Sequence, residues 1–360
     1  MKFFPVPSIV FAFMLAVQSL LAQQADQRFS EGPYLYFKNN KLHAKWIEDG
    51  QLKSAENLSS DKLKTLFGWD SGIEIIKKKM REKPEPQQHF ANVQKVAVIS
   101  DVHGQFGLMV KLLRQHGVID GNNRWAFGEG HLVVNGDIAG RGTQVTEAFW
   151  LVYHLEIQAA AAGGKVHYLA GNHEQMLLSG DNRFLHEKYT QSARLMGITI
   201  QEMYGKNSVL GDWLRNRPAM VKIDDYLFVH AGISPEYLGR ELTDEKTNKL
   251  FYNYILGSKR PARQLSNTIS FLNGENGPIW YRGYFVEGQV DGSTIDSMLK
   301  YFDVQRIIVG HTSLRRVTAM HRARIIAVDS NIKEGIDGEI LLIEGDKYFR
   351  GTQSGEKIPL

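Results

Sequence analysis

An apolar run ends in two candidate metal ligands in the segment Val96-Ala97-Val98-Ile99-Ser100-Asp101-Val102-His103-Gly104. Its β-branched residues are typical of a buried strand, and the polar residues follow where that strand would end. Four later segments repeat this arrangement: His131–Val134 before Asn135-Gly136-Asp137, Val166–Ala170 before Gly171-Asn172-His173-Glu174, Tyr226–Val229 before His230-Ala231-Gly232, and Arg306–Val309 before Gly310-His311-Thr312. Because open α/β sheets gather their chemistry at the carboxyl ends of strands, we expect these side chains to converge.

The segments between and after these runs indicate the fold class. Helical patterns cover Phe106–His116 and Thr146–Ala162, between the first three expected strands, as βαβ units require. Two further strand-like runs, Arg324–Val328 and Glu339–Glu344, follow without long helices between them. The residues therefore predict an α/β protein with a mixed sheet.

The chain before Val96 has a different character. Tyr34–Lys38 and Lys41–Ile47 alternate apolar and polar residues around Asn39-Asn40, which favours a hairpin. Lys83–Gln88 contains two prolines and is typical of a linker. We therefore divide the chain into a leader (1–22), a small β-containing extension with its linker (23–95), a catalytic domain (96–350) and a C-terminal tail (351–360).

The leader has the layout of a secretory signal peptide. Lys2 precedes the apolar stretch Ile9–Val17, and Leu20-Leu21-Ala22 leads into polar residues. We expect cleavage near Ala22; a buried N-terminal helix is the alternative. Because the apolar stretch is too short to cross a bilayer, we expect an exported protein, periplasmic or secreted, without stable membrane insertion.

Composition limits the partners and the reaction classes. A formal net charge of +4 over 360 residues is too small to imply a nucleic-acid partner. The absence of cysteine excludes disulfides and a cysteine-nucleophile phosphatase. No phosphate-binding loop of the Gly-x4-Gly-Lys-Ser/Thr type is present. We expect a monomer.

The candidate ligands are aspartate, histidine and asparagine, a mixed oxygen and nitrogen set that suits manganese, iron or zinc. Two such ions about 3.5–4 Å apart can clamp a phosphoryl group and hold an attacking hydroxide in line. Asp137 is the central candidate for a bridging carboxylate. A structural role for the histidines and a simple turn role for the nearby glycines are the alternatives at each single motif, whereas the ordered set favours a two-metal site.

Together the motifs resemble the phosphoprotein phosphatase family of metallophosphoesterases, over roughly Val96–Ile343. Within it the chain is most similar to the Shewanella-like protein phosphatases, which include a psychrophilic bacterial tyrosine phosphatase. The segments that carry this resemblance are Asp101-Val102-His103-Gly104, Gly136-Asp137 through Arg141-Gly142, Gly171-Asn172-His173-Glu174, His230-Ala231-Gly232, Gly310-His311, Trp125–Gly130 and Gly277–Gly283. The resemblance implies a calcineurin-like catalytic domain: a β-sandwich of mixed sheets flanked by helices, with two divalent metal ions at the strand ends.

The resemblance also implies a role for each site residue. The metal ligands would be Asp101 and His103 for the first ion, Asp137 as the bridge, and Asn172, His230 and His311 for the second. His173 would protonate the leaving oxygen as general acid, while Arg141, together with Asn172, and Arg282 would hold the phosphate. A guanidinium fork matches a phosphate dianion, and an acid assists departure of an alkoxide or phenolate.

One position departs from the family pattern. Family members usually carry aspartate immediately before the motif arginine, whereas this chain has Gly140 before Arg141. In the family that carboxylate is thought to orient the acid histidine, so we expect weaker catalysis here, above all for serine alkoxides. A carboxylate from elsewhere in the fold is an alternative means of holding His173.

The sequence thus predicts a dinuclear-metal phosphomonoesterase that acts on phosphotyrosine in peptides or proteins, on small aryl phosphates, and on phosphoserine or phosphothreonine. A nucleotide phosphoesterase of the diadenosine tetraphosphatase kind is the alternative enzyme, because it shares the metal motifs. The alternative from a different functional class is a phosphate-binding relative with weak or no activity. The reason to consider it is that Gly140 replaces the usual aspartate.

Overall fold

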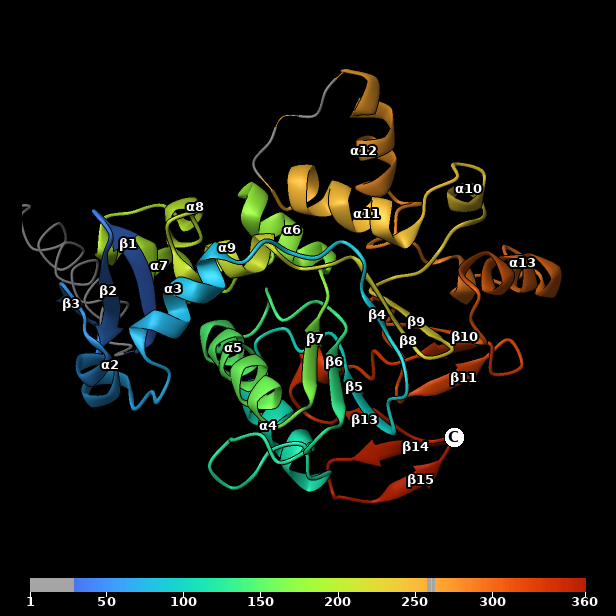
Figure 1. The fold of residues 1–360 in the computed structure, drawn as a ribbon, viewed down its shortest axis with the longest axis horizontal. Coiled ribbons are helices and arrows are strands. Elements are labelled where there is room, and N and C mark those ends of the chain that lie inside the picture. Colours follow the sequence, from blue (N-terminus) through green and yellow to red (C-terminus); the bar gives the residue numbers. More distant parts are fainter. Residues whose placement is uncertain (1–28, 258–259, 261–262) are drawn as a thin grey trace, which may run out of the picture.

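The computed structural model describes residues 29–257, 260 and 263–360, whose arrangement is shown in Figure 1. The predicted signal peptide, residues 1–22, lies outside the described residues. Within the described part of the chain, no helix is both long enough and apolar enough to cross a membrane.

Two six-stranded mixed sheets form the centre of the fold. The strands of the first are β5 (Lys95–Ile99), β6 (His131–Val134), β7 (Lys165–Tyr168), β13 (Glu339–Glu344), β14 (Lys347–Thr352) and β15 (Lys357–Pro359), in the order β15-β14-β13-β5-β6-β7. Those of the second are β4 (His89–Phe90), β8 (Met220–Ile223), β9 (Tyr226–Val229), β10 (Arg306–Val309), β11 (Thr318–Met320) and β12 (Ile325–Ala327), in the order β11-β12-β10-β9-β8-β4. The β5, β6 and β7 strands are mutually parallel, and β13 joins them antiparallel, which confirms the predicted mixed sheet.

The sheets pack face to face because their strands alternate apolar side chains between two layers. The shared layer between the sheets contains Val96, Val98, Val133, Leu341 and Ile343 from the first, and Val221, Ile223, Phe228, Ile308 and Ile326 from the second. The intervening residues point outward: Ala97 and Ile99 join one helix-covered core, and Leu227 and Val229 join another. The expected β-sandwich flanked by helices is therefore confirmed.

Helices cover the outer faces of the sandwich (Figure 1). The helices are α2 (Ser60–Phe67), α3 (Ile73–Arg81), α4 (Phe106–Gln115), α5 (Val145–Ala161), α6 (Asn172–Ser179), α7 (Glu187–Met196), α8 (Ile200–Met203), α9 (Val209–Arg215), α10 (Pro235–Leu238), α11 (Asp244–Leu250), α12 (Ser266–Leu272) and α13 (Gly292–Phe302). Helices α4 and α5 lie beside the first sheet, and α13 lies beside the second. The predicted helices at Phe106–His116 and Thr146–Ala162 correspond to α4 and α5.

The N-terminal extension is a separate three-stranded antiparallel sheet of β1 (Glu31–Lys38), β2 (Lys41–Glu48) and β3 (Gln51–Ala55). Its predicted hairpin turns at Asn39 and Asn40, both of which have positive φ, as the tightest hairpin turns require. The end of the extension, β4, pairs with β8 of the second sheet. Likewise, the expected tail contains β15, which pairs with β14.

A buried polar cluster fastens the extension to α5 and α7. The Tyr34 hydroxyl donates to Glu31 Oε1 at 2.8 Å and lies 3.1 Å from Thr146 Oγ1. Lys188 Nζ lies 2.6 Å from Glu31 Oε2 and 3.8 Å from Glu147 Oε1. One cation therefore faces two carboxylates, a charge imbalance that favours protonation of one of them.

That imbalance predicts a pH dependence of stability. Burial, and then the Glu31 charge, raise the pKa of Glu147 from 4.5 to about 7. The folded state therefore binds a proton more tightly than the unfolded state, so stability falls as pH rises from 4.5 through about 7. We expect Glu147→Gln to be more stable than wild type at pH 8 by about 1 kcal/mol, since the side chain is 32% exposed and solvent screens the repulsion. Urea unfolding at pH 5 and pH 8 measures this difference; identical pH profiles for the two proteins would contradict it.

Candidate metal centre

The six predicted metal ligands are all buried and all lie just beyond a strand end: Asp101 and His103 after β5, Asp137 after β6, Asn172 after β7, His230 after β9 and His311 after β10. The centre therefore lies across the carboxyl ends of strands from both sheets. Hydrogen bonds join the two halves; in one of them the His311 amide donates to Asp101 Oδ2 at 2.9 Å.

The loops that carry these residues turn through an unusual backbone conformation. Left-handed φ angles occur at Asp101 (52°), His103 (46°), Asp137 (56°), Arg141 (65°) and His311 (64°). Side chains other than glycine seldom adopt this region, and such residues gather at functional sites. Hydrogen bonds between loops stabilise these conformations. The His103 amide donates to Asp137 O and the Gly104 amide donates to Ile138 O, both at 3.0 Å.

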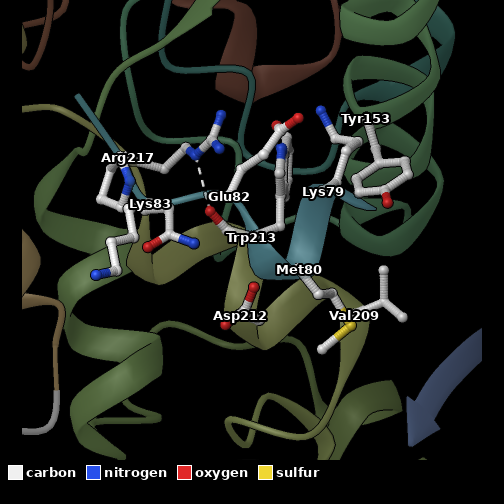
Figure 2. Close-up of a pocket in the computed structure, with 11 residues that line it drawn as sticks. Lys79, Met80, Glu82, Lys83, Tyr153, Val209, Asp212, Trp213 and Arg217 are labelled. Atoms are coloured by element: carbon white, nitrogen blue, oxygen red, sulfur yellow. Dashed lines mark hydrogen bonds between the residues drawn. The ribbon is translucent and has the colours of Figure 1, made fainter. Parts of the chain in front are cut away.

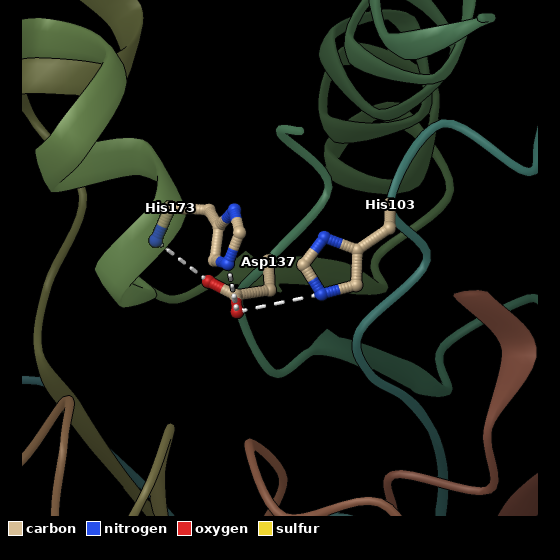
Figure 3. A group of neighbouring side chains, drawn as sticks. All are labelled: His103, Asp137 and His173. Atoms are coloured by element: carbon tan, nitrogen blue, oxygen red, sulfur yellow. Dashed lines mark hydrogen bonds and ion pairs between the residues drawn. The ribbon is translucent and has the colours of Figure 1, made fainter. Parts of the chain in front are cut away.

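Asp137 lies at the middle of two groups of potential ligand atoms. His103, Asp137 and His173 form one group, drawn in Figure 3, and Asp137, His230 and His311 form the other; within each group the ligand atoms lie within 4.8 Å of one another. Asp137 Oδ2 is 3.6 Å from His103 Nε2 and 3.3 Å from His230 Nε2. A carboxylate shared by two ligand groups is the arrangement that a bridged pair of ions requires.

Backbone carbonyl groups set the tautomers of two imidazoles. His103 Nδ1 donates to Ala139 O at 2.8 Å, and His230 Nδ1 donates to Asn135 O at 2.7 Å. In each ring the Nε2 atom is left to face the centre. Such outer hydrogen bonds orient histidine ligands and raise their basicity toward a metal.

The protonation states of His311, His103 and Asp137 fit a metal centre. At His230, burial opposes protonation but the Asp137 charge raises the pKa to about 10, so an ion would have to displace the Nε2 proton. Burial lowers the pKa of His311 to about 2 and that of His103 to about 3, so both rings are neutral at physiological pH. Burial opposes ionisation of Asp137, but His230 and His173 hold its pKa well below the usual value. His311 Nε2 is buried and has no hydrogen-bond partner among the described residues. An orphaned imidazole nitrogen beside an ionised carboxylate is suited to bind a divalent cation.

Asn172 and Asp101 complete the set of oxygen donors. Asn172 Oδ1 lies 3.0 Å from His230 Nε2, and Asp101 Oδ1 lies 3.9 Å from His103 Nε2. The other Asp101 oxygen, Oδ2, accepts hydrogen bonds from Ser100 Oγ and from the His311 amide. This leaves Oδ1 as the Asp101 atom available to an ion.

Two carboxylates near the centre were not assigned from the sequence. Glu174 accepts hydrogen bonds at 2.9 Å from the amides of Asp137, Ala139 and Gly171, so it ties the β6 loop to the start of α6. Asp329 is buried and accepts from Ser313 Oγ at 2.6 Å; after burial itself, its charge is the main cause of the raised pKa of Asp101. Asp329 directly follows the predicted strand Arg324–Val328. The other ligands were identified as polar residues that follow predicted strands, and the same criterion would have identified Asp329.

Both predicted phosphate-binding arginines lie at the same centre. The Arg141 amide donates to Phe184 O at 2.5 Å, and its guanidinium carbon lies 5.2 Å from the centroid of the Phe184 ring. Arg282 Nη1 donates to His311 O at 3.2 Å and to Thr312 Oγ1 at 3.0 Å. The two guanidinium groups thus approach from the β6 side and the β10 side of the centre.

The glycine that departs from the family pattern lies against the predicted acid. Gly140 has φ +84°, and a Cβ atom built on it would lie 2.5 Å from His173 Nδ1. With this backbone, an aspartate at position 140 would require the His173 ring to move. Asp181 is a carboxylate from elsewhere that interacts with His173 electrostatically: Arg183 lowers the pKa of Asp181, and His173 adds to that effect.

A pocket elsewhere in the molecule is unrelated to this centre. Figure 2 shows a pocket between α3 and α9 that none of the predicted site residues lines. Its wall contains Lys79, Met80, Glu82, Lys83, Tyr153, Val209, Asp212, Trp213 and Arg217.

Comparison with known proteins agrees with the geometry. The solved structure of a cold-active protein-tyrosine phosphatase from a psychrophilic Shewanella species is 37% identical, with a TM-score of 0.83 over 92% of this chain and 99% of its own. Shewanella-like protein phosphatase 2 of Arabidopsis thaliana is 23% identical over 353 residues, 84% of this chain and 88% of its own. A symmetrical bis(5'-nucleosyl)-tetraphosphatase of Chromobacterium violaceum is 32% identical over 145 residues, 39% of this chain and 44% of its own.

These similarities confirm the resemblance to the Shewanella-like protein phosphatases. The profile of the calcineurin-like phosphoesterases matches residues 94–314, which contain every predicted ligand and both predicted arginines. The protein belongs to the calcineurin-like phosphoesterase family.

Proposed function

We propose that the protein is a dinuclear-metal phosphomonoesterase that hydrolyses phosphotyrosine in peptides or proteins, and phosphoserine and phosphothreonine more slowly. The observation that carries this proposal is the pair of buried ligand groups that share Asp137. The 37% identical structure over 92% of the chain is that of a protein-tyrosine phosphatase, which supports phosphotyrosine as the substrate.

The ligand assignment follows the positions of the donor atoms. We assign Asp101 and His103 to the first ion, Asp137 to both, and Asn172, His230 and His311 to the second. Divalent ions held there, manganese, iron or zinc, would polarise the phosphoryl oxygens and lower the pKa of an attacking water.

The remaining roles belong to side chains of the chain itself. Arg141 and Arg282 bind the phosphate as bidentate donors and hold it in line for attack. His173 donates a proton to the leaving oxygen, because its Nε2 atom faces the centre 3.9 Å from Asp137 Oδ2. Glu174 keeps the loop of Asp137 in position through its three amide hydrogen bonds.

The nucleotide phosphoesterase is the second candidate, and the partial match to a symmetrical bis(5'-nucleosyl)-tetraphosphatase favours it. That match covers 39% of this chain, whereas the protein-tyrosine phosphatase covers 92%. We rank phosphoprotein substrates first for this reason. We further propose that the protein is exported as a monomer after removal of residues 1–22, in keeping with the signal-peptide pattern.

Metal removal tests the proposed function. After chelation we expect turnover of an aryl phosphate and of a phosphotyrosine peptide to fall by at least about 100-fold, because metal clamps supply several kcal/mol of transition-state stabilisation. Added Mn²⁺ should restore it. Circular dichroism before and after chelation checks that the fold survives.

Three results would count against the proposed function. Turnover of aryl phosphate that persists without metal would contradict the two-metal mechanism. Restored turnover of diadenosine tetraphosphate that exceeds turnover of every phosphopeptide would favour the nucleotide alternative. Bound metal with no turnover of any phosphate ester would favour the inactive phosphate-binding relative.

A further inference from the structure

Phe184 is an exposed aromatic side chain beside a buried polar centre. Its relative exposure is 41%, so much of the ring is open to solvent. The ring centroid lies 5.2 Å from that of His173, with 42° between the ring planes. The Arg141 guanidinium carbon also lies 5.2 Å from the Phe184 centroid. Phe184 therefore contacts both the predicted acid and a predicted phosphate-binding arginine.

The loop that carries Phe184 is held at several points. At its start the Asp181 amide donates to Met176 O at 2.9 Å, which closes the end of α6. The carbonyl of Phe184 accepts the Arg141 amide at 2.5 Å. These hydrogen bonds hold the backbone at Phe184 in place before any ligand arrives, and such preorganisation of a contact segment favours binding.

The positions of His173 and Arg141 restrict where a substrate can extend. In the proposed function, the phosphate of a monoester lies on Arg141 and its bridging oxygen lies next to His173. The organic group attached to that oxygen must leave the centre past these two side chains. Phe184 is the exposed aromatic ring in contact with both of them. A planar aryl group can stack on a phenylalanine ring or meet its edge, whereas a short alkyl group covers little of it.

We propose that Phe184 is the aromatic contact for the leaving group, and that it makes the protein select aryl phosphomonoesters such as phosphotyrosine over alkyl ones. This inference rests on the proposed function. It assigns the substrate preference to a ring contact in addition to the better leaving ability of a phenolate.

Phosphonate inhibitors separate the ring contact from the chemistry, because they bind without being cleaved. With the metal-loaded full chain, we expect Phe184→Ala to raise the inhibition constant of benzylphosphonate by about 3- to 10-fold, the range of an aromatic pair. The constant of methylphosphonate should stay within about twofold, since its methyl group does not reach the ring. Phe184→Tyr should restore tight binding of benzylphosphonate. For Phe184→Ala we also expect kcat/KM for a phosphotyrosine peptide to fall by about 3- to 10-fold. For a phosphoserine peptide of the same sequence, kcat/KM should stay within about twofold.

Tyr301→Ala is the matched control, because Tyr301 is a 39% exposed aromatic on α13 and should affect neither inhibitor. Equal weakening of both phosphonates by Phe184→Ala would overturn the inference, since Phe184 would then act through Arg141 or His173. Unchanged binding of both would overturn it as well. A wild-type protein that neither cleaves phosphomonoesters nor binds either phosphonate would instead overturn the proposed function itself.

Discussion

Replacing Asp137 by asparagine should lower kcat/KM for aryl phosphates by roughly 10³-fold or more. Asp137 is the residue common to both ligand groups, and its carboxylate lies 3.3 Å from His230 Nε2 and 3.6 Å from His103 Nε2. An amide in its place is neutral and cannot bridge two cations through charged oxygens. Loss of metal-assisted charge stabilisation worth about 4 kcal/mol corresponds to this factor. Initial rates and the metal content per chain, measured on the same preparation, check the prediction.

Asp303→Asn is the matched control for this exchange. Asp303 has a left-handed φ of 52°, close to the 56° of Asp137, but its side chain is fully exposed at the end of α13. The control should retain wild-type activity and both ions. An Asp137→Asn protein that keeps two ions and more than about a tenth of the activity would contradict a bridging role.

Replacing His173 by alanine should lower turnover of a phosphotyrosine peptide by about 10²-fold and that of the matching phosphoserine peptide by about 10³-fold or more, the range of a general acid. The difference arises because a phenolate, with a conjugate-acid pKa of about 10, departs with less protonation than an alkoxide does. Steady-state kinetics on the two peptides give both factors.

Metal analysis of the same variant separates two roles for His173. Its Nε2 atom lies in one ligand group with His103 and Asp137, so the geometry also allows it to bind an ion. A general acid predicts two ions per chain in His173→Ala, with the loss greater for phosphoserine. A protein with one ion per chain and equal losses on both peptides would make His173 a ligand.

Much of the fold was predictable because its strands are local apolar runs. The expected strands His131–Val134, Tyr226–Val229, Arg306–Val309 and Glu339–Glu344 have the same bounds in the structure. The short strands β4 and β15 were missed, since they arise from pairing with β8 and β14 and have no pattern of their own. Their pairing partners lie in other parts of the chain, and long-range pairing of this kind is not visible in a local sequence window.

The residues alone predicted a mixed sheet, and only the family resemblance implied its division into the two sheets of a sandwich. The first three ligand-bearing strands lie in one sheet, and the last two lie in the other. Each run is apolar on both faces, so its sequence is equally compatible with either sheet. The choice depends on which side chains meet in the layer between the sheets.

The sequence by itself determined the residue types of the centre and their places after strands, because ligand chemistry and strand-end position are local properties. Only the tertiary structure decided how these residues meet: that Asp137 is shared by two groups, that Glu174 holds its loop, and that Phe184 contacts His173. It also decided the meaning of Gly140, whose left-handed backbone places His173 Nδ1 where a side chain would begin. These facts depend on distances between segments far apart in the chain, and such distances are set by the packing of the two sheets.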